Sequence, residues 1–374
     1  MRRLAAIAYT IVIATAILLW YALDANRGNR NYTADEDSSE PAVVEPEVII
    51  NSDTIRLIFG GDFMQHTPPV DAARTADGGY DYTPSIEYIA PLFQQADVAV
   101  VNLETTITTS GRYTGYPCFS SPVAVVDALV DMGIDIALLA NNHCCDKFSR
   151  GINTTIEELE RREIAHTGVY RDSTDYAKNN IIRFDVRGVR FALLNYTYGT
   201  NGITIPAGKI VNLIDDDIIT RDLRGINRDS VDCVIACMHW GNEYERKQNR
   251  EQKRLAELLR REGADIIIGG HPHVVQPYEV DSAHVVFYSL GNLVSNQQRR
   301  YCDGGIIAEV EVIRCDTVDG LRYRAKDHPV YIICPGYKIT PRAIGDTLTM
   351  SDDLRRRYNQ FHSDTDENLA TSRL

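Results

Sequence analysis

The sequence predicts an α/β fold, in which strands and helices alternate along the chain and the strands end at reactive side chains. Three observations lead to this prediction. Six short apolar runs, rich in β-branched residues, stop abruptly at polar residues that are able to bind a metal. Two segments between them, 155–162 and 252–262, carry apolar residues at helical spacing. The composition, with 44% hydrophobic and 24% charged residues, is that of a folded protein and excludes wholesale disorder.

An uncharged apolar stretch, LAAIAYTIVIATAILLWYAL, occupies residues 4–23 and directly follows Arg2 and Arg3. As a helix it is roughly 30 Å long, enough to cross the hydrocarbon core of a bilayer. Because positive charge stays on the cytoplasmic side, residues 1–24 are predicted to be a single-pass signal anchor with the C-terminal domain outside the cytoplasm. A cleaved signal peptide is the alternative, but the stretch is long and no clear A-x-A site follows it.

Residues 25–53 change abruptly to a polar and acidic composition, with six acidic residues and no basic one between positions 35 and 47. Such a segment cannot bury enough apolar surface to fold alone, so we interpret it as a flexible linker, with an acidic interaction tail as the alternative. The whole chain has a net charge of −13. This balance argues against a general nucleic-acid binder, which needs basic surface to neutralise phosphates.

A single large domain is predicted for residues 54–340, and its apolar runs share one kind of ending. They continue into GGD (60–62), NLE (102–104), NNH (141–143), HWG (239–241), GGHPH (269–273) and LGN (290–292). Ligands of open α/β sheets collect beyond the carboxyl ends of the strands, so these endings indicate one common site. Each motif alone has an ordinary explanation, such as a helix cap or a turn. Together they supply carboxylate, amide and imidazole groups suited to Zn, Mn, Fe or Mg.

The sequence His271-Pro272-His273 has a further property. Alternate residues of an extended segment point to opposite sides, so both histidines can face one centre only if the chain bends. Gly269 and Gly270 before them, with Pro272 between them, supply that irregularity. The pattern favours a loop that holds a metal.

These motifs resemble the bacterial capsule-synthesis protein CapA family, also called poly-γ-glutamate biosynthesis proteins. The resemblance covers roughly residues 55–296 and rests on GGDFM (60–64), NLE (102–104), ANNHCCD (140–146), HWGNEY (239–244), GGHPHVVQP (269–277) and SLGN (289–292). It implies a fold similar to the calcineurin-like metallophosphatases: a sandwich of two β-sheets flanked by helices, with two divalent metal ions at the strand ends.

The resemblance also implies a role for each matching residue. The implied metal ligands are Asp62, Glu104 (which would bridge both metals), Asn142, His239, His271 and His273. His143 matches the catalytic histidine, which would donate a proton to the leaving group. Asp146 would orient His143, with a helix cap as the equally weighted alternative. Two metals would lower the pKa of a bridging water.

The sequence departs from the phosphatase pattern at three positions. Met64 stands where related phosphatases have a histidine ligand, Glu104 replaces an aspartate, and Phe148 stands where the family often shows glycine. His66 is a candidate substitute for the missing ligand, or else a surface histidine. A one-metal or non-catalytic site is therefore an open alternative.

Two arginines are predicted to bind substrate, because Arg112 and Arg246 directly follow loops of the site and an anionic polymer needs a basic group there. Solvated surface charge is the alternative for each.

The resemblance implies a membrane-anchored protein that acts in synthesis or export of a capsule or poly-γ-glutamate-type polymer, by metal-dependent hydrolysis or transfer at a phosphoester or amide. A non-catalytic polymer-binding or export subunit and a secreted metallophosphodiesterase are the alternatives. Expected partners are the anionic polymer or its precursor, the membrane and other capsule subunits, but no nucleic acid.

Eight cysteines are present without a C-x-x-C motif, and an exported domain permits disulfides. Cys233 and Cys237 are predicted to be buried free thiols on one face of a strand, whereas Cys144 and Cys145 are possible soft metal ligands. Segments 304–315 and 330–334 are expected to complete a sheet. Residues 341–374 are predicted to be a polar C-terminal tail, either helical or loose from residue 352 onward.

Overall fold

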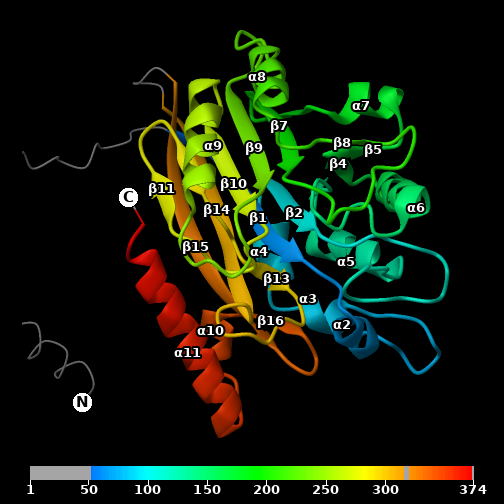
Figure 1. Cartoon of the computed structure of the whole chain (residues 1–374). Coiled ribbons are helices and arrows are strands. Elements are labelled where there is room, and N and C mark those ends of the chain that lie inside the picture. Colours follow the sequence, from blue (N-terminus) through cyan, green and yellow to red (C-terminus); the bar gives the residue numbers. More distant parts are fainter. Residues whose placement is uncertain (1–51, 316–319, 373–374) are drawn as a thin grey trace, which may run out of the picture. The chain divides into compact units, whose positions relative to one another are not determined.

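The computed structural model describes residues 52–315 and 320–372, in which two β-sheets lie between layers of helices (Figure 1). The predicted signal anchor and almost all of the predicted acidic linker lie outside the described residues. None of the helices within the described ranges combines the length and apolar character that a membrane crossing requires.

The first sheet has eight strands in the order β16-β15-β14-β1-β2-β3-β4, with β13 beside the end of β1. Strands β1 to β4 and β13 run parallel, whereas β14, β15 and β16 are antiparallel to their neighbours. The bounds are β1 Ser52–Phe63, β2 Val98–Leu103, β3 Ile136–Leu138, β4 Ala165–Thr167, β13 Asn292–Val294, β14 Gly304–Cys315, β15 Leu321–Ile333 and β16 Lys338–Pro341. The carboxyl ends of the parallel strands therefore share one edge.

The second sheet has six strands in the order β11-β12-β10-β9-β7-β6, and its central strands β7, β9, β10 and β12 are parallel. The bounds are β6 Ile182–Val186, β7 Val189–Thr197, β9 Cys233–His239, β10 Ile266–Gly270, β11 Tyr278–Val280 and β12 Val285–Phe287. A small third sheet pairs β5 (Val169–Tyr170) with β8 (Ile210–Val211).

The helices connect these strands, and both predicted helical segments are confirmed. Residues 155–161 form the end of α6 and residues 252–261 lie in α9, with Arg162 and Glu262 as the C-cap residues. Helix α9 begins with a capping box between Asn249 and Gln252. The bounds are α2 Thr67–Ala72, α3 Thr83–Ile86, α4 Ala90–Gln94, α5 Ala124–Met132, α6 Phe148–Arg161, α7 Ser173–Asn179, α8 Asp216–Arg224, α9 Arg250–Arg261, α10 Arg342–Gly345 and α11 Asp352–Leu369.

The layers follow from the alternation of side chains along each strand. Leu57 and Phe59 of β1 face the second sheet, where they join Leu193 and Ile235 in the core between the sheets. Ile58, between them in sequence, faces the opposite way, into the core beneath the helices. The predicted two-sheet sandwich flanked by helices therefore matches the arrangement of the apolar clusters.

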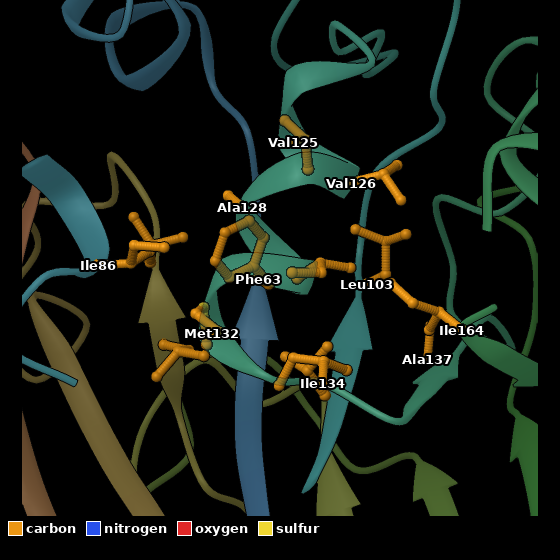
Figure 2. Packing of buried hydrophobic residues seen from close by; sticks show 14 of the residues in the cluster. Phe63, Ile86, Leu103, Val125, Val126, Ala128, Met132, Ile134, Ala137 and Ile164 are labelled. Atoms are coloured by element: carbon orange, nitrogen blue, oxygen red, sulfur yellow. The ribbon is translucent and has the colours of Figure 1, made fainter. Parts of the chain in front are cut away.

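Helix α5 covers the strand ends that lead into the candidate site. Figure 2 shows Phe63 and Leu103, at the ends of β1 and β2, packed beneath Val125, Ala128 and Met132 of this helix. These side chains are at most 2% exposed. Burying each large apolar side chain contributes roughly 1.5–3 kcal/mol, so this packing holds the two strand ends in place. On the other outer face, α8 and α9 cover the second sheet.

The C-terminal residues differ from the predicted polar tail. After β16, helices α10 and α11 pack on the first sheet, and Tyr358 and Phe361 of α11 contact Tyr331 of β15. Only one face of α11 is buried, so its average composition is polar although Tyr358 is 1% exposed. Residues 341–372 are thus part of the folded body, with the helical alternative realised.

The structure also describes two pairs of cysteines that the sequence singles out. Cys233 and Cys237 have free, buried thiols that lie in the core between the sheets, as the spacing predicted. Cys144 and Cys145 are also free, with their sulfur atoms 3.8 Å apart. Neither belongs to a group of side chains arranged to bind a metal in the described residues.

Candidate metal centre

The ends of β1, β2, β9 and β10 bring the predicted metal ligands together where the two sheets meet. Side-chain atoms that lie within 4.8 Å of one another form two groups, one of Asp62, Glu104 and His239 and the other of Glu104, His271 and His273. Each of these side chains is at most 4% exposed. Glu104 belongs to both groups, which is the arrangement expected of a bridging carboxylate.

Two buried ligand atoms in this cluster have no hydrogen-bond partner within the described chain. They are Oε1 of Glu104 and Nδ1 of His271. Oε1 of Glu104 lies 3.6 Å from Nε2 of His239 and 4.0 Å from Nε2 of His273. Unpaired buried polar atoms are costly, and a cation among them would satisfy them. The donor set of carboxylates and imidazoles therefore fits a divalent metal.

The charges of the cluster support the same interpretation. Burial raises the pKa of Glu104 well above its usual range, and the negative charge of Asp62 adds to this rise. Burial lowers the pKa of His239 well below its usual range, and burial with repulsion from His273 lowers the pKa of His271 to about 3. Neutral imidazoles beside buried carboxylates are the forms that bind a metal.

Asn142 also reaches the centre. Its Oδ1 lies 3.0 Å from Nε2 of His239, and its Nδ2 donates to Oδ1 of Asn201 at 3.2 Å. The amide nitrogen of Asn142 thus points toward Asn201 and its oxygen toward the histidine. All six predicted ligands are thus brought together, although their binding of a metal remains a prediction.

The His271-Pro272-His273 segment bends as its composition indicates. His271 and His273 have φ values of +96° and +58°, which non-glycine residues adopt only where the surrounding structure imposes them. The two preceding glycines allow close approach, because a Cβ at Gly269 would lie 2.0 Å from the Tyr288 carbonyl oxygen. A Cβ at Gly270 would lie 2.7 Å from Oδ1 of Asp62. Nδ1 of His273 meets the other oxygen of that carboxylate at 2.9 Å.

His143 lies beside the cluster with its ring held on two sides. Its Nδ1 donates to Oδ2 of Asp146 at 2.8 Å, and its ring meets the Phe119 ring edge-on, with centroids 4.5 Å apart. The same oxygen of Asp146 accepts from the Phe119 backbone N–H. Helix α6 has Lys147 at its N-cap position, so Asp146 orients His143 and does not cap the helix.

The three departures from the phosphatase pattern have distinct structural outcomes. Met64 is buried in the interior at 2% exposed, with a thioether where the pattern has an imidazole. His66 is half-buried, with its Nδ1 accepting from the Asn296 N–H, so it is not a surface histidine, and its role as a substitute ligand remains a prediction. Phe148 has a φ of +52°, the left-handed region that glycine adopts readily, and its side chain is 62% exposed.

The two predicted substrate arginines lie in different surroundings. Arg112 is exposed. Arg246 stacks on the Tyr301 ring at 4.2 Å and donates to the backbone carbonyl of Asp364 in α11. These contacts tie Arg246 to the C-terminal helix, so its substrate role, like that of Arg112, remains a prediction.

Three residues of the site were not identified from the sequence. Asn102 donates to Oδ1 of Asp62 at 2.8 Å and to Oε2 of Glu104 at 3.2 Å, and so holds both carboxylates. The Tyr198 ring lies 4.4 Å from the His271 ring. Asn201 lies 3.5 Å from Nε2 of His143 through its Nδ2. The NLE motif contains Asn102, and an Asn-Gly turn signal marks Asn201, but neither reveals these contacts.

The family model described as "Bacterial capsule synthesis protein PGA_cap" matches residues 56–297. The chain belongs to this family. The matched segment contains every predicted metal ligand, so the PGA_cap resemblance stated from the motifs is confirmed.

Two relatives of the PGA_cap chain carry capsule names. PGA biosynthesis protein CapA of Bacillus subtilis (strain 168) is 30% identical over 253 residues, covering 66% of this chain and 65% of the relative. Capsule biosynthesis protein CapA of Bacillus anthracis is 28% identical, over 59% of this chain and 55% of the relative. The chain thus spans less than two thirds of their lengths.

Among solved structures, Haemophilus influenzae NAD nucleotidase (NadN) aligns with a TM-score of 0.49 and 11% identity, covering 84% of this chain and 63% of that one. This likeness is too distant to carry an argument.

Proposed function

We propose that this PGA_cap protein is a metal-dependent hydrolase or transferase that acts on a phosphoester or amide bond during synthesis or export of a polyglutamate-type polymer. The observation that carries the proposal is the unpaired Oε1 of Glu104, which two groups of buried ligand atoms share beside the His143–Asp146 pair. Structural carboxylates in protein interiors are paired, so an unpaired one among neutral histidines favours a cation site.

The residues around the site have separable roles in this proposal. Asp62, Glu104, Asn142, His239, His271 and His273 would hold the metal ions, which when bound lower the pKa of a coordinated water. Asp146 accepts from Nδ1 of His143 and so leaves Nε2 on the side of Asn201. A protonated Nε2 donates its proton to the leaving group.

The surroundings of the site also bear on the proposal. Tyr198 is 46% exposed and its ring lies tilted against the His271 ring, so it covers part of the ligand set while still facing solvent. An anionic polymer or its precursor enters at this open side.

We further propose that residues 1–24 anchor the chain in the cell membrane, with the folded domain outside the cytoplasm and beside other capsule subunits.

A non-catalytic polymer-binding or export subunit is the second candidate. One observation favours it: buried Met64 stands where related phosphatases have a histidine ligand, which leaves the centre with one ligand fewer. A secreted metallophosphodiesterase would use the same residues on a different substrate.

Elemental analysis of the purified protein, run beside a hydrolysis screen, tests the proposal. We expect bound transition metal, and turnover of a glutamate-polymer or precursor bond that is lost in His143→Ala. Protein without bound metal whose His143→Ala variant still supports polymer production would instead establish the non-catalytic subunit. Turnover confined to chromogenic phosphodiesters with added manganese would indicate the phosphodiesterase.

A further inference from the structure

A tyrosine beside the metal centre, and an arginine that lies over its ring, have no part in the proposed reaction. The Tyr244 backbone N–H donates to the carbonyl of Pro272 at 2.8 Å, which joins it to the loop that carries His271 and His273. The rings of Tyr244 and His273 are 6.3 Å apart between centroids. Tyr244 also has a φ of +68°, a conformation that the surrounding structure must impose on a tyrosine.

Arg299 extends from the loop after β13 and lies over this tyrosine. Its guanidinium carbon is 4.3 Å from the centre of the Tyr244 ring. A cation stacked on an aromatic face is held in a defined orientation, and the planar edge of the guanidinium still presents its N–H donors. The arrangement therefore places an oriented cation one tyrosine ring away from His273, a predicted metal ligand.

The neighbouring arginines differ from Arg299 because each already donates hydrogen bonds to Asp364. Arg300 forms two hydrogen bonds with the carboxylate of Asp364, at 3.0 and 2.9 Å. Arg246 donates to the Asp364 carbonyl and stacks on Tyr301. In residues 52–315 and 320–372, Arg299 makes no side-chain hydrogen bond and no ion pair, and its side chain is exposed. Of these three arginines, Arg299 alone has all of its side-chain donors available to a ligand.

We propose that Arg299 and Tyr244 form a subsite that binds a side-chain carboxylate of an acidic, peptide-like polymer next to the bond held at the metal centre. The inference rests on the proposed function and names the part of the substrate that this side of the site recognises. A guanidinium binds a carboxylate through two parallel hydrogen bonds. Stacking on Tyr244 lowers the entropy lost when Arg299 binds, because the side chain is already ordered.

Local charge is needed at this position because the chain as a whole repels a polyanion. Its net charge is −13, and Glu243 lies beside Tyr244 and contributes negative charge there. An oriented arginine therefore gives a carboxylate a favourable position that the overall field does not provide.

Equilibrium binding of a fluorescent γ-linked glutamate pentamer to the full chain, with chelator present to stop turnover, tests the subsite. We expect Arg299→Gln to weaken binding about tenfold, the factor that corresponds to one charge-assisted hydrogen-bonded contact. Arg299→Lys should retain part of the affinity, because it keeps the charge but loses the planar fork. The matched control is Arg300→Gln, which removes an equal charge one residue away and should leave affinity unchanged. Thermal unfolding of each variant verifies that it is folded.

The outcomes are distinct. If Arg299→Gln binds the pentamer as tightly as the unaltered chain, the subsite is overturned. If Arg300→Gln loses as much affinity as Arg299→Gln, the subsite is also overturned, because the loss then reflects general charge attraction. Inorganic phosphate and free glutarate can each be tested as competitors of pentamer binding. If phosphate competes more strongly than glutarate, and this competition is abolished in Arg299→Gln, the carboxylate assignment is overturned. Loss of pentamer binding in Arg299→Gln, together with no transition metal in elemental analysis of the purified protein before chelator is added, confirms the subsite and removes the hydrolase proposal.

Discussion

Two buried glutamates of the first sheet have opposite electrostatic surroundings. Glu309, 3% exposed on β14, accepts hydrogen bonds from Arg56 at 3.1 and 3.2 Å and from His328 at 2.8 Å. Burial alone would raise its pKa, but these bonds outweigh burial and lower the pKa to about 2. Glu104, fully buried after β2, has no protein cation against its unpaired oxygen, and burial raises its pKa.

The difference separates a structural carboxylate from a ligand. The fold supplies Glu309 with its own counter-charge, so that residue is complete within the chain. Around Glu104 the nearest groups are Asp62, Asn102 and neutral histidines, which leave the negative charge uncompensated. A carboxylate in such surroundings is stable in its ionised form only with an added cation.

The strongest test of this contrast is metal-linked stability. At a free metal concentration of 1,000 times the Kd, binding adds about 4 kcal/mol to the free energy of unfolding, which corresponds to a Tm rise of roughly 8 °C for a domain of this size. We expect chelation to remove this rise in the unaltered chain. Glu104→Gln should show no rise, because the amide cannot replace the shared carboxylate.

Glu309→Gln is the matched control for this measurement, since it alters a buried glutamate of the same sheet away from the site. Its Tm should still respond to metal and chelator as in the unaltered chain. A metal response that persists in Glu104→Gln would break the contrast between the two carboxylates. Because metal competes with the proton that Glu104 binds readily, the response should also weaken as pH falls.

The second test concerns the stability contributed by Glu309. Its folded pKa lies below the unfolded value, so it stabilises the fold above pH 4.5, and this contribution is lost as pH falls toward about 2. Glu309→Gln should lower the free energy of unfolding by about 1–3 kcal/mol at pH 7 and by much less near pH 2, as measured by denaturant unfolding. Glu311→Gln, which removes only a contact with Lys326, should cost less. Equal losses at both pH values would show that Glu309 acts through packing and not through charge.

The third test concerns Asn201, whose amide contacts both Asn142 and His143. Asn201→Ala should weaken metal affinity about tenfold, the effect typical of residues that orient a ligand. Asn201→Asp keeps an acceptor for Asn142 but adds negative charge beside His143, which favours the protonated imidazole. The pH–rate profile of Asn201→Asp should therefore move to higher pH while metal affinity is largely retained. Thr200→Ala controls for changes in the loop, and equal effects of Thr200→Ala would assign the result to loop structure.

The residues of the site that lie at the ends of strands could be predicted from the sequence. Asp62 and His239 lie at the ends of parallel strands, and parallel strands of neighbouring sheets deliver their endings to one edge. The bend at His271 followed from the glycines and the proline around it. These features depend on local chemistry and on strand direction, both of which can be inferred from a single sequence.

The remaining features depend on contacts between distant segments. Arg246 donates a hydrogen bond to the backbone carbonyl of Asp364 in α11, 118 residues away in the sequence. Its position after the His239 loop does not reveal this contact. Asn201 belongs to a loop without hydrophobic periodicity, so nothing local places it beside His143. The buried face of α11 is hidden by the polar average of its sequence, and only its packing on Tyr331 shows that it belongs to the fold.

The smallest expected effects concern the two arginines predicted to bind substrate, and they extend the contrast from carboxylates to cations. Arg112 is exposed, so Arg112→Ala should weaken binding of an anionic polymer only about two- to threefold, and added salt should abolish the difference. Arg246 is held by Tyr301 and the Asp364 carbonyl, so Arg246→Ala should combine a similarly small loss of affinity with a lower Tm. Titration of the polymer at two salt concentrations, with turnover measured in parallel, separates these effects. If neither variant changes turnover or affinity, both residues are ordinary surface charge, and recognition of the polymer depends on groups closer to the metal ligands.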